Sequence, residues 1–136
     1  MTKAGFMEYL TEGICGIFST VREDKMPEAR GWQFQYEENG KYYFATANTK
    51  EVFAQLKAHP KAAFTYMEPN GKYTLRITGD VGFITDAEQK KAAWEHMAPP
   101  VKGKYKAWDN PILEIIYIEN AELKFEKGFN DTEKVE

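Results

Sequence analysis

The sequence predicts a single domain over residues 1–136, mainly β with helices, built as a six-stranded antiparallel barrel. Three observations predict this fold class. Short runs of alternating or aromatic residues follow one another along most of the chain, as strands do. Asn-Gly pairs at 39–40 and 70–71 separate neighbouring runs, and both residue types tolerate the positive φ of tight hairpin turns. A chain of 136 residues can bury one core but is too short for two ordinary domains.

The strands are expected at residues 14–22, 28–36, 41–46, 61–68, 72–85 and 111–127. In the fifth run Leu75, Ile77 and Val81 alternate with polar residues and share one face, and Gly79 marks a bend or bulge. Six strands in hairpin order would leave exposed edges. Closure into a barrel removes those edges and is therefore favoured.

Three helices are expected among these strands. The first covers residues 4–11, and the second follows Lys50 directly. The third opens at Thr85-Asp86-Ala87-Glu88, which has the form of a capping box, and continues to about Met97, where Pro99 and Pro100 end it.

Composition excludes several functions. A net charge of −3 without a basic stripe argues against nucleic-acid binding, which depends on cations that neutralise phosphates. No eighteen uncharged apolar residues occur in a row, so no membrane segment is expected. The single cysteine, Cys15, lies in an apolar run and is expected to be a buried, reduced thiol. Together these features predict a cytoplasmic protein.

The sequence offers no catalytic constellation. His59 and His96 each stand near the end of an expected helix, where a cation complements the helix dipole, and this explanation is favoured over metal or haem ligation. The carboxylates are scattered over turns and helix surfaces. No metal site is expected and no catalytic residue is assigned.

Arginine is scarce, with three residues against fifteen lysines. Arg30 and Arg76 lie in the middle of expected strands. A guanidinium there can grip a carboxylate or phosphate through two parallel hydrogen bonds. Alternatively, its stem lies along the sheet and its head reaches water.

The joint at residues 47–50 connects an expected strand to an expected helix. Asn48 can be the N-cap of that helix, with Glu51 reaching back to it. Alternatively, the helix start binds an anion through its free N–H groups, with Thr46, Thr49 and Lys50 nearby.

Arg30 favours the second alternative at this joint. The turn at 39–40 would make strands 28–36 and 41–46 neighbours. Counted out from this turn, Arg30 comes roughly opposite residue 48, so we expect the arginine and the joint to converge on one anion.

Three segments resemble the pyridoxamine 5'-phosphate oxidase-like, FMN-binding split-barrel family, in particular its short bacterial members. The resemblance covers residues 16–125. The segments are Pro27–Phe34 (PEARGWQF), Tyr43–Lys50 (YFATANTK) followed by Leu56–Pro60 (LKAHP), and Leu75–Gly79 (LRITG).

The resemblance implies a split β-barrel that forms a homodimer, binds FMN in two equivalent clefts at the subunit interface and acts on a small molecule. It implies that Arg30, Thr49 and Lys50 hold the phosphate and that Arg76 is a possible further contact. It also implies that the backbone of two segments lines the flavin: Gly31, Trp32 and Gln33, and Phe44, Ala45 and Thr46.

Two departures from the family pattern matter. Thr49 and Lys50 are adjacent, whereas the family often has Ser-x-Lys, and no arginine follows Arg76. The second departure disfavours oxidation of vitamin B6 itself. An FMN-dependent oxidoreductase is the leading hypothesis. The alternatives are a non-catalytic flavin-binding or stress-associated module, and a barrel that binds another ligand such as haem.

Overall fold

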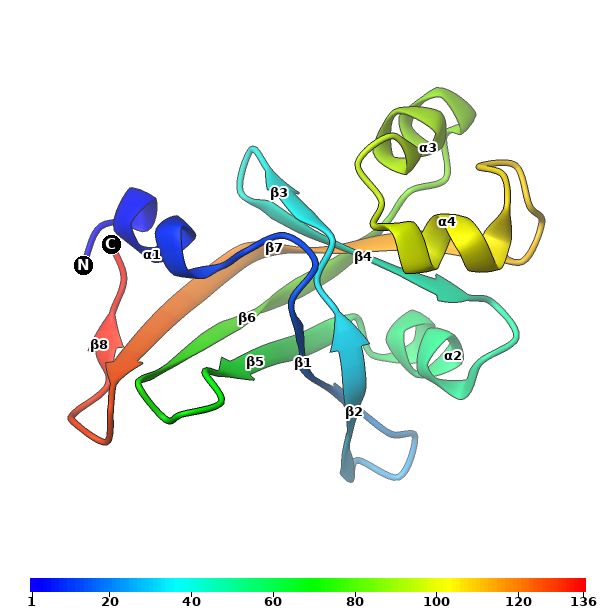
Figure 1. Ribbon diagram of the computed structural model, residues 1–136. Helices are drawn as coiled ribbons and strands as arrows, with labels where there is room; N and C mark the ends of the chain where they lie inside the picture. The colour runs from blue at the N-terminus through cyan, green and yellow to red at the C-terminus, as the bar shows by residue number, and fades with distance from the viewer.

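The computed structural model describes residues 1–136 as one antiparallel sheet with helices on its outside (Figure 1). The helices are α1 (Lys3–Tyr9), α2 (Glu51–Ala58), α3 (Ala87–Trp94) and α4 (Pro99–Tyr105). The strands are β1 (Cys15–Val21), β2 (Pro27–Gln33), β3 (Tyr36–Glu38), β4 (Lys41–Ala47), β5 (Lys61–Met67), β6 (Tyr73–Phe83), β7 (Leu113–Lys127) and β8 (Glu133–Lys134). The predicted fold class is confirmed. The expected six strands become eight, because the second run divides and the tail adds β8.

The division of the second run shapes the barrel. The strand order is β2-β1-β5-β6-β7-β4-β3, with β8 on β7. The Phe34 N–H donates to the Ile14 carbonyl, and the Phe34 carbonyl accepts from the Gly13 N–H, just before β1. The next N–H, of Gln35, donates instead to the Tyr43 carbonyl of β4 over 3.0 Å. The extended run 27–38 therefore changes partner at Phe34–Gln35 and forms both ends of the strand order. The expectation that all of 28–36 pairs with 41–46 is wrong, although the turn at Asn39-Gly40 is confirmed.

The main core lies inside the barrel. The aromatic rings of Phe18, Phe34, Phe44 and Phe64 are fully buried there. The predicted inner face of β6 is confirmed by the burial of its aliphatic residues, and its register shifts between Thr78 and Asp80, as the glycine between them predicted.

A second core lies on the outer face of β4 and β7, which α3 and α4 cover. Asp86, not Thr85 of the predicted capping box, is the N-cap of α3, and its side chain accepts from the Gln89 N–H over 2.9 Å. Helix α4 was not expected, since Pro99 and Pro100 were assigned only the role of a stop. They occupy the first positions of α4, where proline fits because the first N–H groups of a helix have no internal partner.

Cys15 is exposed, so the expectation of a buried thiol is wrong. Side chains along β1 alternate between the two faces of the sheet. Phe18 and Thr20 point into the barrel, which leaves Cys15 and Ile17 on the outside. Among the helices, none has the length and apolar character needed to cross a bilayer.

Candidate binding site at the open edge of the barrel

The free edges of β2 and β4 face each other across an opening in the barrel. β2 pairs only with β1, and residues 44–47 of β4 pair only with β7. The two strands diverge from the β3 hairpin, and α2 lies beyond them (Figure 1). The Trp32 indole bridges the opening, because its Nε1 donates to the Ala45 carbonyl oxygen over 2.7 Å.

This bridge brings together two predicted groups of site residues, 31–33 on β2 and 44–46 on β4. Gly31 is exposed, whereas Phe44, Ala45 and Thr46 are buried. The Gln33 side chain donates to the Gly13 carbonyl. Since the side chains on β4 are buried, this edge presents mainly backbone groups to a ligand.

The start of α2 has no side-chain cap. Lys50 is the N-cap residue and makes no capping hydrogen bond. Asn48 was an alternative N-cap, and this assignment is wrong. Its amide donates instead to the Pro111 carbonyl (2.9 Å) and to Glu114 Oε2 (3.0 Å), which ties the joint to the start of β7. The first N–H groups of α2 therefore lack a side-chain acceptor and carry the partial positive charge of a helix start.

Helix α4 places Lys104 beside Lys50. Burial, and then the charge of Lys104 and a contact with its side chain, lower the pKa of Lys50. Neither lysine has a carboxylate within ion-pair distance. Two neighbouring ammonium groups without a counter-ion stand next to the exposed Thr49 and the uncapped helix start, which makes this corner electropositive.

Sequence reasoning did not identify Lys104. Helix α4 itself was not predicted, and nothing local distinguishes this lysine from the others in the chain.

Arg30 lies elsewhere than the residue count suggested. It is opposite Phe18 on β1, so the expectation that it faces residue 48 is wrong. Its guanidinium still reaches α2. Nη1 donates to Thr20 Oγ1 (2.8 Å), and Nη2 donates to Glu28 Oε1 and Gln55 Oε1 (both 3.1 Å).

This arginine has an internal counter-ion. The hydrogen bond from Gln55 and, more weakly, the charge of Arg30 hold the pKa of Glu28 below its ordinary value, against the opposing effect of burial. The Arg30 side chain is 24% exposed and its guanidinium is hydrogen-bonded to protein groups, so Arg30 connects β2 to α2 rather than presenting free donors.

Arg76 does not lie near the start of α2 with Lys50 and Arg30. It lies near the start of β6, at the end of the sheet far from α2 (Figure 1). Its Nη2 donates to Glu126 Oε2 (3.3 Å) and Thr132 Oγ1 (3.5 Å). No group of three or more His, Cys, Asp or Glu side chains is arranged to hold a metal ion.

An antiparallel barrel opened between β2 and β4, with a helix start at the opening, defines the split-barrel class. The profile of the pyridoxamine 5'-phosphate oxidase family matches residues 3–123, and the chain belongs to this family. No curated protein matches the sequence significantly.

Solved structures agree with this assignment. A NimC/NimA family protein from Clostridium acetobutylicum is 26% identical, with 96% of this chain and 89% of that chain covered and a TM-score of 0.79. General Stress Protein 26 from Bacillus anthracis is 17% identical, with 97% of both chains covered and a TM-score of 0.75. A pyridoxamine 5'-phosphate oxidase-related, FMN binding protein from Nostoc punctiforme is 14% identical, with 88% and 78% covered and a TM-score of 0.71. The last two similarities are similarities of fold.

Proposed function

We propose that this chain binds FMN at the opening between β2 and β4 and is a flavin-dependent oxidoreductase for a small molecule. The observation that carries the proposal is the Lys50–Lys104 pair beside the uncapped start of α2. Family membership and the fold shared with an FMN binding protein support it.

The phosphate of FMN fits the donors at this corner. The first N–H groups of α2, the Thr49 hydroxyl and the two ammonium groups of Lys50 and Lys104 would hold it. A dianion there would turn the repulsion between the two lysines into two favourable charge pairs, and charge-assisted hydrogen bonds to phosphate are the strong ones. Arg30 would orient α2 through Gln55, and it would contact the phosphate directly only by releasing Glu28.

The flavin ring would lie along the open edge. FMN, when bound, supplies the electron and hydride chemistry. The chain's own contribution would be to orient the ring against the backbone of Gly31–Gln33 and Phe44–Thr46 and to exclude water from it. We assign no protein acid or base.

Two copies of the chain would complete the site. Ile17 and Met67 are 49% and 58% exposed on the outer face of β1 and β5, and Cys15 is exposed beside them. Ile17 is opposite Gly31 in the β1–β2 register, so this apolar patch borders the proposed ring site. Exposed apolar patches often mark interfaces. We therefore propose a homodimer with the two FMN sites at its interface.

Spectroscopy and native mass spectrometry test the cofactor and the dimer together. We expect a yellow protein with the visible absorption of flavin and a mass of two chains carrying two FMN molecules. Ile17→Lys should give monomers that lose FMN. A colourless protein that FMN does not bind would refute the proposal, and a haem spectrum would support the haem alternative instead.

Titration with FMN tests the phosphate site. Lys50→Ala should weaken binding by about 10- to 100-fold, since a charge-assisted hydrogen bond contributes roughly 1.5–3 kcal/mol. Lys127→Ala, an exposed lysine at the end of β7, is the matched control and should bind as the unaltered chain does. Equal affinity in both variants would contradict the assignment of the phosphate site. Reduction of the bound flavin by a nicotinamide separates an oxidoreductase from a non-catalytic flavin module.

A further inference from the structure

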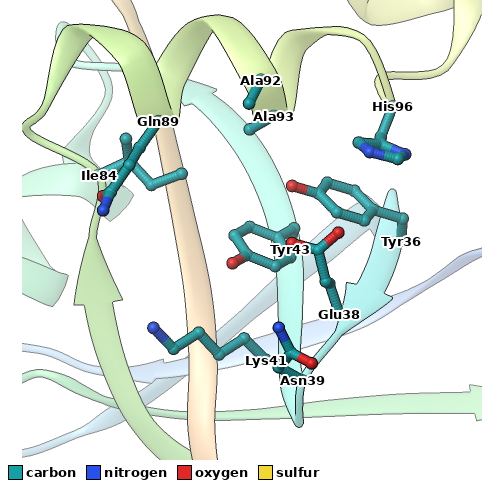
Figure 2. A pocket seen from close by; sticks show the side chains of 10 residues that line it. All are labelled: Tyr36, Glu38, Asn39, Lys41, Tyr43, Ile84, Gln89, Ala92, Ala93 and His96. Atoms are coloured by element: carbon teal, nitrogen blue, oxygen red, sulfur yellow. The ribbon is translucent and has the colours of Figure 1, made fainter.

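A second cavity lies between the β3–β4 hairpin and α3, with a volume of about 280 Å³ (Figure 2). Its polar lining comes from Tyr36, Glu38, Asn39, Lys41, Tyr43, Gln89 and His96. Lys41 begins β4 and Ala47 ends it, so this cavity and the start of α2 are separated by the length of the strand, ~20 Å. None of its lining residues belongs to the proposed FMN site. Ligand pockets usually measure roughly 300–1,000 Å³, so this one suits a small molecule.

One wall of the cavity is an aromatic stack. The rings of Tyr36 and Tyr43 are parallel, with centroids 4.3 Å apart and 4° between their planes. His96 stacks on the other face of Tyr36 at 4.4 Å. Because neighbouring rings cover the faces of Tyr36, it can offer a ligand its edge and hydroxyl rather than a stacking surface.

Both tyrosine hydroxyls are unpartnered within the chain. Tyr36 and Tyr43 are 5% and 8% exposed. Unlike the hydroxyl oxygen of Tyr42, their hydroxyl oxygens are not fully buried, and they make no hydrogen bond to a protein group. Both hydroxyls are therefore open to the cavity that they line and can donate to a ligand in it. Burial raises the pKa of both phenols, which keeps them protonated and able to donate.

The cavity also holds two opposite charges that do not neutralise each other. Glu38 and Lys41 are opposite residues in the β3–β4 register, but they form no ion pair. The Lys41 ammonium lies 4.6 Å from the centre of the Tyr117 ring instead. Figure 2 shows that the Lys41 ammonium and the Glu38 carboxylate point to different sides of the cavity, and that the Tyr43 hydroxyl and the Gln89 amide lie on the Lys41 side.

We propose that this cavity binds a small amino acid, a molecule with one carboxylate and one ammonium group. The Lys41 ammonium, the Tyr43 hydroxyl and the Gln89 amide receive the carboxylate. The Glu38 carboxylate receives the ammonium. Ile84, Ala92 and Ala93 form an apolar wall against which methylene groups pack.

Isothermal titration of the full chain at low salt tests this site. The probes are glycine, 4-aminobutanoate and 6-aminohexanoate, which differ in the spacing of their charges, with butanoate and butylamine as ligands of one charge. We expect at least one amino acid to bind at least tenfold more tightly than either singly charged ligand. No heat from any amino acid would overturn the proposal, and so would equal binding of butanoate and the amino acids.

Charge-neutral variants locate the binding. Lys41→Gln and Glu38→Gln should each weaken the amino acid at least tenfold, whereas Lys72→Gln, an exposed lysine in the β5–β6 turn, should not. Circular dichroism checks the fold of each variant. Unchanged affinity in both folded cavity variants would refute the site. The titration does not depend on flavin, so its failure and the failure of FMN binding are separate results.

Discussion

The Arg30 guanidinium donates to Gln55 Oε1 over 3.1 Å and thereby joins the middle of β2 to α2. The same guanidinium binds Thr20 and Glu28, so one side chain organises polar groups from three elements. Gln55 in turn donates to Glu28 Oε1 over 2.9 Å, which closes the network. This network, together with the packing of Val52 and Leu56 in the main core, holds α2 and its uncapped start in place.

Removal of this arginine should destabilise the protein. Arg30→Ala leaves Glu28, Thr20 and Gln55 without their shared donor, and we expect a loss of roughly 1–3 kcal/mol in the free energy of unfolding. Lys124→Ala removes an exposed pair with Glu122 and serves as the control, with an expected change of about 0.5 kcal/mol or less. Urea denaturation measures both. Equal losses in the two variants would show that the network contributes no more than a surface ion pair.

Gln55→Ala separates the two possible roles of Arg30 in FMN binding. If Arg30 acts by orienting α2, this variant should weaken FMN about as much as Arg30→Ala does. If Arg30 contacts the phosphate, Arg30→Ala should weaken FMN at least tenfold more. Fluorescence quenching of FMN measures both affinities.

Lys104→Ala should have opposite effects on the free and the FMN-bound protein. Without FMN, the repulsion between Lys104 and Lys50 is relieved, so the melting temperature should rise slightly. With FMN, a phosphate contact is lost, and affinity should fall about tenfold. Lys102→Ala, two residues away and on roughly the opposite side of α4, is the control and should leave FMN affinity unchanged. A Lys104→Ala variant that binds FMN normally would remove this lysine from the site.

The stability difference between Lys104→Ala and the unaltered chain should depend on pH. When folding lowers the pKa of a lysine, the charged lysine reduces the free energy of unfolding. This reduction is complete at any pH where the lysine is charged in both the folded and the unfolded protein. The reduction disappears as pH rises from the folded pKa of Lys50 towards its ordinary value of 10.5. The advantage of the variant should therefore be largest near pH 7 and shrink at alkaline pH. Urea midpoints measured across this range check the sign.

Tyr42 should make the protein sensitive to alkali. Its hydroxyl is buried without a hydrogen-bond partner, and burial raises its pKa from 10.0 to about 12. A raised pKa contributes stability that is complete below pH 10 and is lost as pH rises towards 12. Tyr42→Phe should be neutral or stabilising by up to about 1 kcal/mol at pH 7, because no hydrogen bond is lost.

Above pH 10 the same variant should exceed the unaltered chain by as much as about 3 kcal/mol. Tyr9→Phe, which changes a partly exposed ring, is the control. The prediction is wrong if the two variants lose stability with pH in the same way as the unaltered chain.

Two glycines should respond oppositely to alanine. At Gly16 on β1 an added Cβ would lie 2.5 Å from the Thr65 carbonyl oxygen and 2.6 Å from the Phe64 ring, so the strands must separate. Gly16→Ala should cost roughly 1–3 kcal/mol, as overpacked cores do. Gly103 on α4 has nothing within 4 Å, and Gly103→Ala should gain roughly 0.5–1 kcal/mol through helix propensity. Thermal unfolding distinguishes the two signs.

Local sequence signals were sufficient for much of the fold. The Asn39-Gly40 turn, the inner face of β6 and the start of α3 depend on residues close in the chain, and all three are confirmed, although the N-cap of α3 is Asp86 rather than Thr85. The change of partner at Phe34–Gln35 could not be predicted this way. An alternating aromatic run suits either neighbour, and the choice depends on packing across the whole sheet.

The candidate site was also only partly predictable from the sequence. The change from a strand pattern at 41–46 to a helix pattern after Lys50 places Thr49 and Lys50 at a helix start. The position of Lys104 next to Lys50 depends on α4, and the two prolines at the start of this helix made it look like a break in the sequence. The hydrogen bonds of Arg30 with Glu28, Thr20 and Gln55 depend on the observed strand register. The sequence alone could not show which charged residues from distant parts of the chain lie next to each other in this site.

The run 27–38 pairs with β1 at one end and with β4 at the other. One continuous stretch of polypeptide therefore supplies both β2 and β3, the first and last strands of the sheet order. Barrel closure here depends on covalent continuity rather than on a ladder of hydrogen bonds between β2 and β4. Phe34 and Gln35, where the run changes partner, are both buried, and the Trp32 indole spans the opening through its hydrogen bond to Ala45. A ligand bound between β2 and β4 would therefore touch strands at or next to both ends of the strand order at once.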